Sequence, residues 1–346
     1  MNFCAPKEVV NMISIRQLAR IANVSPGVVS RVLNEDPTLS VSDETRKRVL
    51  ALIKQYNYQP TKRQGKKWIN SLCVITTLTE AEEVTDAYFR LILQGISEAA
   101  AETHFKIKTI YRLQDHPTMN DIPKYAGLIF VGAIENKVVQ AFRDQNEHLV
   151  LIDNQVNTLV ANRVDPDLSS MAKMAFQYFL NQGIRSLGFI GGQLSSVGVD
   201  GKVTHPTQEV RLNTLHALSD AQENLTFHSK MGQWTPEFGY EAATSLLKEN
   251  PDIRAIIAAS DPIALGAIRS LHDLGIAVPE QVQIVGFDDL DYSRYLVPRL
   301  STFRMPTKEI GAEAVRILVR ELTSEYTDIR QVRLAGSLIH RETTKN

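Results

Sequence analysis

Short apolar, β-branched runs alternate with amphipathic stretches from Leu72 onward. The runs LCVITTL, KIKTIYR, GLIFVG and HLVLID are interrupted by two segments with helical spacing of apolar residues, at about 87–103 and 135–146. A strand, helix, strand order predicts a parallel sheet, because the helix returns the chain to the edge where the next strand starts. The chain from Leu72 to about residue 153 is therefore expected to form one open α/β unit.

A second unit repeats this scheme. Its expected strands are SLGFIGG, AIIAAS and VQIVGF. Its expected helices span about 168–182, 207–222, 236–250 and 262–274. Two such units in series predict two lobes, each with a parallel, doubly wound sheet. Ligands of these folds bind beyond the carboxyl ends of the strands, so we expect a ligand site in the cleft between the lobes.

Residues 14–58 read instead as three short helices with the spacing of a helix-turn-helix. A capping box, Ser14 to Gln17, opens the first helix, and an asparagine, Asn23, suits the tight turn that ends it. The second helix has an N-cap serine, Ser25, and a proline, Pro26, at its first position. This spacing predicts a second helix that can enter a groove of DNA.

A third helix, from about Asp43 to Tyr56, is expected to be capped by Ser42 and to turn Val49, Leu50 and Ile53 inward. An ordinary helical hairpin would show the same spacing, so the charge distribution is needed to choose. Residues 1–70 carry twelve Lys or Arg against five Asp or Glu, a net +7, whereas the remainder carries −8. A basic head on an acidic body favours binding to phosphates by the head alone.

Several other classes are disfavoured. The two cysteines, Cys4 and Cys73, have no spacing typical of a disulfide framework or a zinc site, which favours the reducing cytoplasm. No dinucleotide fingerprint, phosphate loop, nucleophile elbow or H-E-x-x-H pattern is present. Asp288 and Asp289 could form an acid–base pair, but neighbours at a strand end point opposite ways. We therefore expect no metal, no cofactor and no enzymatic activity.

The sequence also shows no signal peptide and no transmembrane run, so we expect no membrane association. Met12 directly precedes the first helix. A start at Met12 is an alternative to Met1 and would make the first eleven residues dispensable.

The segment VSPGVVSRVLN, followed by YNYQP, resembles the head of the LacI/GalR family, where V-S-x-x-T-V-S-R-V-L-N and N-Y-x-P recur. The resemblance implies a sequence-specific DNA-binding head. It assigns these DNA-facing positions: Ser25, Pro26, Gly27, Ser30, Arg31 and Asn34. Pro26 and Gly27 occupy the base-reading positions and offer few hydrogen-bonding atoms. We therefore expect Arg31, whose planar fork suits a guanine edge, to carry more of the readout than Ser25 or Ser30, which face phosphates.

The linker departs from the family pattern. The family usually continues N-x-x-A-R-x-L, a hinge helix whose leucine enters the minor groove. This chain reads TKRQGKKWIN, with no matching alanine or leucine. We predict that the linker contacts phosphates through Lys62, Arg63, Lys66 and Lys67, with weak or absent wedging in the minor groove. A solvated linker without DNA contacts is the alternative.

The core resembles the family's periplasmic-binding-protein-like core. The motif V-G-F-D-D matches the family's effector-contacting aspartate, here Asp288. TQEVRLNTL matches its effector-binding arginine, here Arg211, although Thr214 replaces the usual glycine. The remaining expected effector-binding residues are Tyr88, Asp153, Arg163 and Ser260. Phe89 fits core packing as well as a pocket, and Asp261 is expected to cap the helix that follows it.

The resemblance sets expected domain limits. These are an N-terminal extension (1–13), the helix-turn-helix domain (14–59), a basic linker with a shortened hinge (60–70), a first lobe (71–162 with about 303–330) and a second lobe (163–302 with about 331–342). The segments NEDPTLSVSDETRKR, LQDHPT and AASDPIALGAIR look most like the branch that regulates galactose and β-galactoside genes.

The expected function is a cytoplasmic, homodimeric repressor that binds double-stranded operator DNA and responds to a sugar between its lobes. Galactose or a β-galactoside is the expected effector. Another sugar, a purine or a corepressor is an alternative within the family, and a sugar-binding transport protein is the alternative outside it.

Overall fold

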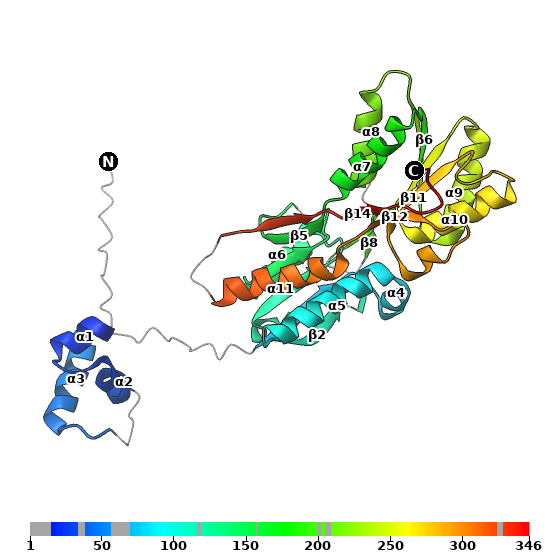
Figure 1. Cartoon of the computed structure of the whole chain (residues 1–346). Helices are drawn as coiled ribbons and strands as arrows, with labels where there is room; N and C mark the ends of the chain where they lie inside the picture. Colours follow the sequence, from blue (N-terminus) through cyan, green and yellow to red (C-terminus); the bar gives the residue numbers. More distant parts are fainter. Residues whose placement is uncertain are drawn as a thin grey trace, which may run out of the picture. The chain divides into compact units, whose positions relative to one another are not determined.

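The structure is a computed structural model, which describes residues 15–33, 39–56, 70–115, 119–156, 158–198, 202–204, 209–323 and 328–345. The chain divides into two compact units, Met1–Trp68 and Ile69–Asn346. Figure 1 shows the helices and strands of both units.

The described part of the first unit contains three helices: α1 (Ile15–Ile21), α2 (Pro26–Leu33) and α3 (Asp43–Gln55). The turn between α1 and α2 passes through Asn23, whose φ of 51° is the left-handed conformation expected of this asparagine. Ser25 Oγ accepts a hydrogen bond from the amide of Val28 at 3.3 Å, and Pro26 is the first residue of α2. The predicted start of the second helix is therefore confirmed.

The core of this unit is small and apolar. It contains Leu18, Ala19, Ala22, Val29, Val32, Leu39 and Val49. The Nε of Arg48 donates to the carbonyl oxygen of Ala22 at 3.2 Å and ties α3 to the end of α1. The expectation that Leu50 faces inward is wrong, since its side chain is 47% exposed. Val49 already takes the inward position, and the next residue of a helix points about 100° away.

The first lobe of the second unit has one parallel sheet in the order β13-β5-β4-β3-β1-β2. Its strands are β1 (Ser71–Thr76), β2 (Lys106–Arg112), β3 (Gly127–Val131), β4 (Leu149–Ile152), β5 (Asn162–Pro166) and β13 (Gln331–Leu334). Alternate strand residues face opposite layers: Leu72 and Val74 pack under α5 (Ala87–Glu102) and α11 (Thr307–Thr323), while Cys73 and Ile75 pack with α6 (Asn136–Arg143). Short helices α4 (Glu80–Thr85), η1 (Leu113–Asp115) and η2 (Met119–Lys124) complete the lobe.

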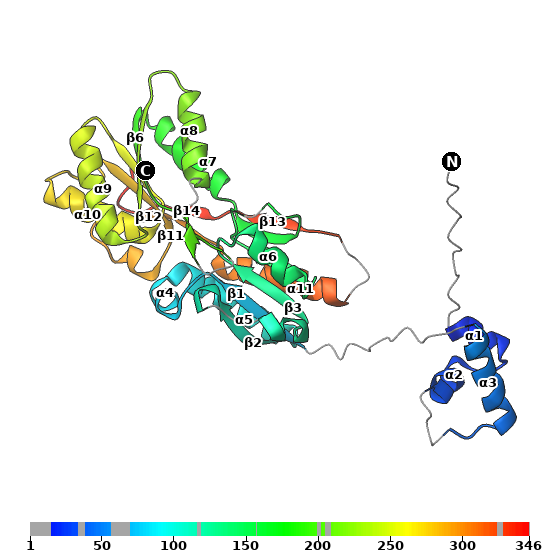
Figure 2. The same cartoon turned by 180° about the vertical axis from the view of Figure 1, so that it is seen from behind.

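The sheet of the second lobe has the order β14-β12-β11-β10-β6-β9. Its strands are β6 (Ser186–Gly192), β9 (Thr226–Gly232), β10 (Ala255–Ala258), β11 (Gln283–Asp288), β12 (Ser301–Arg304) and β14 (Ser337–Ile339), and β14 alone is antiparallel within this sheet. Helix α7 (Leu168–Asn181) packs beside α8 (Val210–Asp220), and α9 (Pro236–Glu249) beside α10 (Asp261–Asp273), as Figure 2 shows from behind. A 3-10 helix, η3 (Asp291–Arg294), follows β11, and a small hairpin, β7 (Ser196–Val197) with β8 (Val203–Thr204), follows β6.

Glycines permit the closest helix contacts in both lobes. A Cβ atom on Gly95 of α5 would lie 2.1 Å from the carbonyl oxygen of Lys308, and one on Gly311 of α11 would lie 2.3 Å from that of Ile92. Helix α11 therefore belongs to the first lobe although it follows β12 of the second. The two-lobed fold of parallel, doubly wound sheets agrees with the fold expected from the sequence.

The chain passes between the lobes after β5, after β12 and after β13. The expected lobe boundaries at residues 163 and 331 lie inside strands of the first sheet. Arg163 pairs with Leu151 of β4 and with Gln331 of β13. Both strands carry charged residues because β5 lies near the sheet edge and β13 forms it, so neither shows the apolar run of a buried strand.

Candidate functional site

The outward face of α2 is the candidate DNA-binding surface. Ser25, Pro26, Gly27 and Arg31 are exposed, whereas Val29 and Val32 are buried against α1 and α3. A Cβ atom on Gly27 would meet only Ser25 Oγ, at 3.7 Å, so the space around the first turn of the helix is open. Ser30 is half-buried. The structure thus presents Arg31 as the one long exposed side chain of the described part of this helix.

The other expected DNA contacts lie outside the described residues. These are Asn34, Lys62, Arg63, Lys66 and Lys67, together with the linker to which the last four belong. Ser14 of the expected capping box also lies there.

The first lobe brings Tyr88 and Asp153 together. The hydroxyl of Tyr88, in the first turn of α5, donates to Asp153 Oδ2 at 3.1 Å. Asp153 directly follows β4 and has a φ of 47°. Burial raises the pKa of this carboxyl, which a hydrogen bond from Gln155 and the Tyr88 bond partly offset. A carboxylate held in left-handed backbone at a strand end is typical of a binding site rather than of packing.

Arg211 is the central cation of the second lobe. It lies at the start of α8 with 5% of its surface exposed. Its Nε donates to Glu209 Oε1 at 2.6 Å, and its Nη1 donates to the carbonyl oxygen of Ala259 at 2.6 Å. The guanidinium lies 5.0 Å from the ring centroid of Phe287 and 5.6 Å from that of Trp234. These contacts fix its orientation at the carboxyl edge of the sheet.

Asp288 completes the cluster at the end of β11, with a φ of 114°. Burial and then the nearby Asp261 carboxylate raise its pKa well above the ordinary value, while Arg211 lowers it. Burial likewise raises the pKa of Tyr88, with added repulsion from Asp153 and Asp288. Tyr88 of the first lobe therefore lies within electrostatic reach of Asp288 and Arg211 of the second, and the two strand edges face one site.

Ser260 directly precedes α10, and Asp261 begins it. Ser260 is the N-cap, and its Oγ accepts the amide of Ile263 at 3.4 Å. The expectation that Asp261 caps this helix is wrong. Its fully buried carboxylate instead accepts from the amide of Leu290 (2.8 Å) and from the hydroxyls of Ser293 (2.5 Å) and Thr302 (2.6 Å). Asp261 thus holds the loop that follows Asp288.

Arg163 lies on β5 beside the first-lobe cluster. Its Nη1 donates to the carbonyl oxygen of Asn154 at 3.3 Å, and its Nε lies 3.7 Å from Asp165 Oδ2. Burial, followed by repulsion from Asp153, raises the pKa of Asp165 to about 6. Arg163 therefore supports the strand end that carries Asp153.

Phe89 packs in the first-lobe core, with its ring edge-on to that of Tyr88 at 5.1 Å. It thus takes the packing role that the sequence left open.

Sequence reasoning missed two residues of this cluster. Trp234 is 38% exposed, follows β9, and donates from Nε1 to the carbonyl oxygen of Gln193 at 3.0 Å. Its ring covers Gly192 so closely that a Cβ atom there would lie 2.1 Å away. Glu209 is 1% exposed; besides binding Arg211, it accepts the amide of Leu212 at 2.8 Å and caps α8. The flat, apolar ring of an aromatic residue commonly packs against the apolar face of a sugar.

Two buried polar atoms near these groups find no hydrogen-bond partner in the described part of the chain, Tyr292 Oη and Gln155 Oε1. Tyr292 lies near Asp288 and Asp261, and Gln155 donates to Asp153 at 3.3 Å. Carboxylates, a guanidinium, an indole ring and free polar atoms suit a ligand with several hydroxyl groups and an apolar face.

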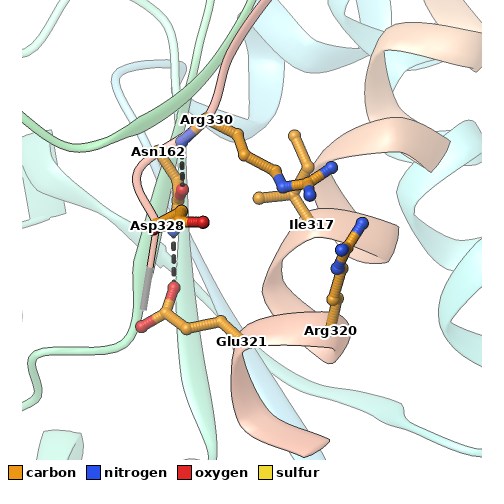
Figure 3. A pocket seen from close by; sticks show the side chains of 6 residues that line it. All are labelled: Asn162, Ile317, Arg320, Glu321, Asp328 and Arg330. Carbon is orange, nitrogen blue, oxygen red and sulfur yellow. Dashed lines mark hydrogen bonds between the residues drawn. The ribbon is translucent and has the colours of Figure 1, made fainter. Parts of the chain in front are cut away.

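A separate small pocket lies between the start of β5 and the last turns of α11 (Figure 3). It is lined by Asn162, Ile317, Arg320, Glu321, Asp328 and Arg330. Asn162 donates to Glu321 Oε2 at 2.5 Å and accepts the amide of Arg330 at 2.9 Å. The pocket has a volume of about 10 Å³, which holds roughly one water molecule, so this pocket is not a sugar site.

Within the described residues, no cluster of three His, Cys, Asp or Glu is placed to hold a metal ion. Within those same ranges, no helix has both the length and the apolar composition needed to cross a membrane.

Comparison with known proteins links both units to one class. The model of bacterial regulatory proteins of the lacI family matches residues 14–61, and that of the periplasmic binding protein-like domain matches residues 176–344. The transcriptional regulator GalR of Lacticaseibacillus casei is 28% identical over 95% of this chain and 99% of its own length. GalR of Streptococcus thermophilus is 29% identical over 96% of this chain and its entire length.

Solved structures share the fold. A complex of the transcriptional regulator CelR with cellobiose has a TM-score of 0.64 at 24% identity, covering 96% of this chain and 99% of that one. A lac repressor dimer bound to operator and the anti-inducer ONPF has a TM-score of 0.65 at 20% identity, with the same coverage.

The helix-turn-helix head and the two-lobed core define a DNA-binding transcriptional regulator. The chain belongs to the LacI family. Its relatives are regulators rather than enzymes, and they match across the head as well as the core, which removes the transport-protein alternative.

Proposed function

We propose that this protein is a repressor of sugar-utilisation genes whose effector is galactose or a β-galactoside bound between the two lobes. The observation that carries the proposal is the convergence of Asp153 and Asp288, two aspartates in left-handed backbone at strand ends of different lobes, around Arg211. Carboxylates accept hydrogen bonds from sugar hydroxyls, and a guanidinium donates to them. Trp234 offers its ring to the apolar face of the sugar.

Control of DNA binding follows from lobe closure. A sugar that contacts both lobes binds the closed shape better than the open one, and a ligand shifts a conformational equilibrium only by this difference in affinity. The chain passes between the lobes three times, and these three connections join the lobes. Closure moves the first lobe relative to the second. In the proposed homodimer, this movement changes the spacing of two heads on a palindromic operator.

The proposed DNA contacts are those of α2 and the basic linker. Arg31 reads a base edge, and Ser25, Pro26, Gly27, Ser30 and Asn34 fit the groove around it. Lys62 and Arg63 neutralise phosphates, which makes DNA affinity fall with increasing salt.

A groove of about 390 Å³ beside the free edge of β2 supports the homodimer. It is lined by Val74, Leu93, Ile96, Ser97, Ile107, Lys108, Thr109 and Ile110. Ile110 is 39% exposed on an edge strand, where a second chain can add contacts. Sedimentation of Ile110→Glu tests this surface: loss of the dimer supports it, and an unchanged dimer places the interface elsewhere.

The test of the proposed function is capture of sheared genomic DNA by the purified protein with and without millimolar galactose, followed by sequencing. Enrichment of a palindrome upstream of galactoside-use genes, lost on adding galactose, supports both the repressor and its inducer. No enriched sequence contradicts the proposed function.

A second candidate effector is a β-glucoside such as cellobiose, which the structurally similar CelR binds. The same capture with cellobiose in place of galactose separates the two. An enriched palindrome that only cellobiose releases keeps the DNA-binding proposal and replaces the effector. A purine effector is less well supported, because the cluster contains several carboxylates and a single exposed ring.

A further inference from the structure

One short segment of the second lobe is built into the first. β7 lies in the connection between β6 and α8, yet Val197 forms a parallel bridge with Ile134, which follows β3. The amide of Val197 donates to the carbonyl oxygen of Ala133 at 3.3 Å. The Val197 side chain is 2% exposed and belongs to the first-lobe core cluster that contains Ile134 and Val138. The lobes therefore share a buried apolar contact beyond the three chain crossings.

A polar contact reinforces this insertion. The Thr204 hydroxyl, on β8, lies 2.7 Å from Ser196 Oγ and donates to Glu135 Oε1 of the first lobe at 3.2 Å. Glu135 occupies the N-cap position of α6, but its side chain makes no capping hydrogen bond. Its carboxylate instead serves the contact across the lobes.

The attachment point in the first lobe is tied to the candidate sugar site. Asn154 is fully buried and follows Asp153 directly. Its Oδ1 accepts the amide of Ile134 at 3.2 Å, and its Nδ2 donates to the carbonyl oxygen of Ile134, also at 3.2 Å. The positions of Asp153 and of the turn that receives Val197 are thus fixed by one side chain.

We propose that Ser196, Val197 and Thr204 form an interlobe clasp that holds the closed lobes together and raises the affinity for the effector. The inference rests on the proposed function, in which the effector binds the closed shape. The apparent affinity for the effector scales with the fraction of the protein that is in the closed, binding-competent shape. A protein that closes readily therefore spends less of the free energy of effector binding on closure. Opening requires Val197 to leave an apolar core and enter water, which favours the closed state.

The first test compares Val197→Ala and Thr204→Val with the wild type. Val197→Ala removes most of the buried contact, and Thr204→Val removes the hydroxyl at nearly constant volume. We expect about tenfold weaker effector binding for Val197→Ala and a smaller loss for Thr204→Val, within the range of ordinary conformational coupling. Operator affinity without effector should not fall. Val203→Ala is the matched control, because Val203 is on the same hairpin with 44% of its surface exposed.

Calorimetric titration with galactose or cellobiose gives the affinities, and thermal unfolding shows that the variants are folded. Unchanged affinity in both folded variants overturns the clasp. An equal loss in Val203→Ala also overturns it, because the effect would then not depend on the interlobe contact.

A second measurement needs no ligand and separates failure of the clasp from failure of the proposed function. Spin labels are placed on exposed positions of different lobes, Glu102→Cys and Lys248→Cys. Cys4→Ser leaves the buried Cys73 as the one native cysteine. We expect the distance distribution between the labels to broaden or shift in Val197→Ala and to stay unchanged in Val203→Ala. Identical distributions in the wild type and Val197→Ala contradict the clasp, whichever effector the protein binds.

Discussion

The guanidinium of Arg211 lies over the ring of Phe287, 5.0 Å from its centroid, and lowers the pKa of the neighbouring Asp288 carboxyl. The carboxylate of Glu209 also fixes this guanidinium, because Arg211 Nε donates to Glu209 Oε1 at 2.6 Å. Neither contact uses the whole donor fork of the arginine. Arg211 is thus oriented by second-lobe residues before a ligand arrives, which reduces the ordering that binding requires.

Arg211→Lys should abolish most of the response to the effector and leave operator binding intact. Lysine keeps the charge that Glu209 needs but loses the planar fork and the contact with Phe287. We expect at least a tenfold weaker effector affinity, measured by calorimetry, with operator affinity measured by fluorescence anisotropy. Arg269→Lys is the control, since Arg269 is an exposed arginine on α10. A normal response in Arg211→Lys removes this residue from the site.

Trp234→Leu should weaken sugar binding about tenfold, since a leucine cannot offer a flat ring for stacking. The protein has two tryptophans, Trp68 and Trp234, so the change in intrinsic fluorescence on adding sugar can be assigned. We expect that change to disappear in Trp234→Leu and to persist in Trp68→Leu. Persistence of the change in Trp234→Leu would mean that Trp234 is not the indole that reports on the effector.

Arg31→Ala should lower the affinity for the operator by about 10- to 100-fold and reduce the preference over random DNA, the size expected for a bidentate contact to guanine. Lys54 is exposed in the last turn of α3. Lys54→Ala should therefore change the operator affinity and the preference over random DNA little. Anisotropy titrations with operator and scrambled duplexes give the ratio. If Arg31→Ala weakens binding to both duplexes equally, Arg31 contacts phosphates and another residue reads the bases.

The raised pKa of Asp165 predicts a pH-dependent stability. With a folded pKa of about 6 and an unfolded pKa of about 3.9, the folded state binds the proton more tightly. The resulting stabilisation is complete below the unfolded pKa and is lost as the pH rises through 6. Between pH 7.5 and pH 5, the wild type should therefore gain about 1.4 kcal/mol of unfolding free energy relative to Asp165→Asn. Urea unfolding at both pH values measures this difference, and equal gains in the two proteins would show that Asp165 does not titrate in this range.

The predictions from sequence were most accurate where local chemistry decides the structure. Asn23 adopts the left-handed turn, Pro26 begins α2, and Ser42 accepts the amide of Thr45 at 3.2 Å. Each outcome depends on a residue and its close neighbours. The buried parallel strands were equally clear, because they are continuous apolar runs.

Positions that depend on distant partners could not be predicted in this way. Asp261 precedes a helix with a proline, as a cap does, but its partners come from Leu290, Ser293 and Thr302, which lie far along the chain. Trp234 was missed because β9 is a polar edge strand with the sequence TFHSKMG, so no strand end was expected before it. Tyr88, Asp153, Arg211 and Asp288, which the family resemblance supplied, lie near one another, whereas Arg163 lies within β5 and Ser260 caps α10. Their role in binding remains a proposal.

The central claim is that a sugar held by Asp288 and its neighbours controls the binding of DNA by the head. Anisotropy of a labelled operator bound to the wild type and to Asp288→Ala, titrated with galactose and cellobiose, tests it most directly. The account predicts equal operator affinity for the two proteins without sugar, and release by sugar from the wild type only. Release of both proteins at the same sugar concentration would contradict it.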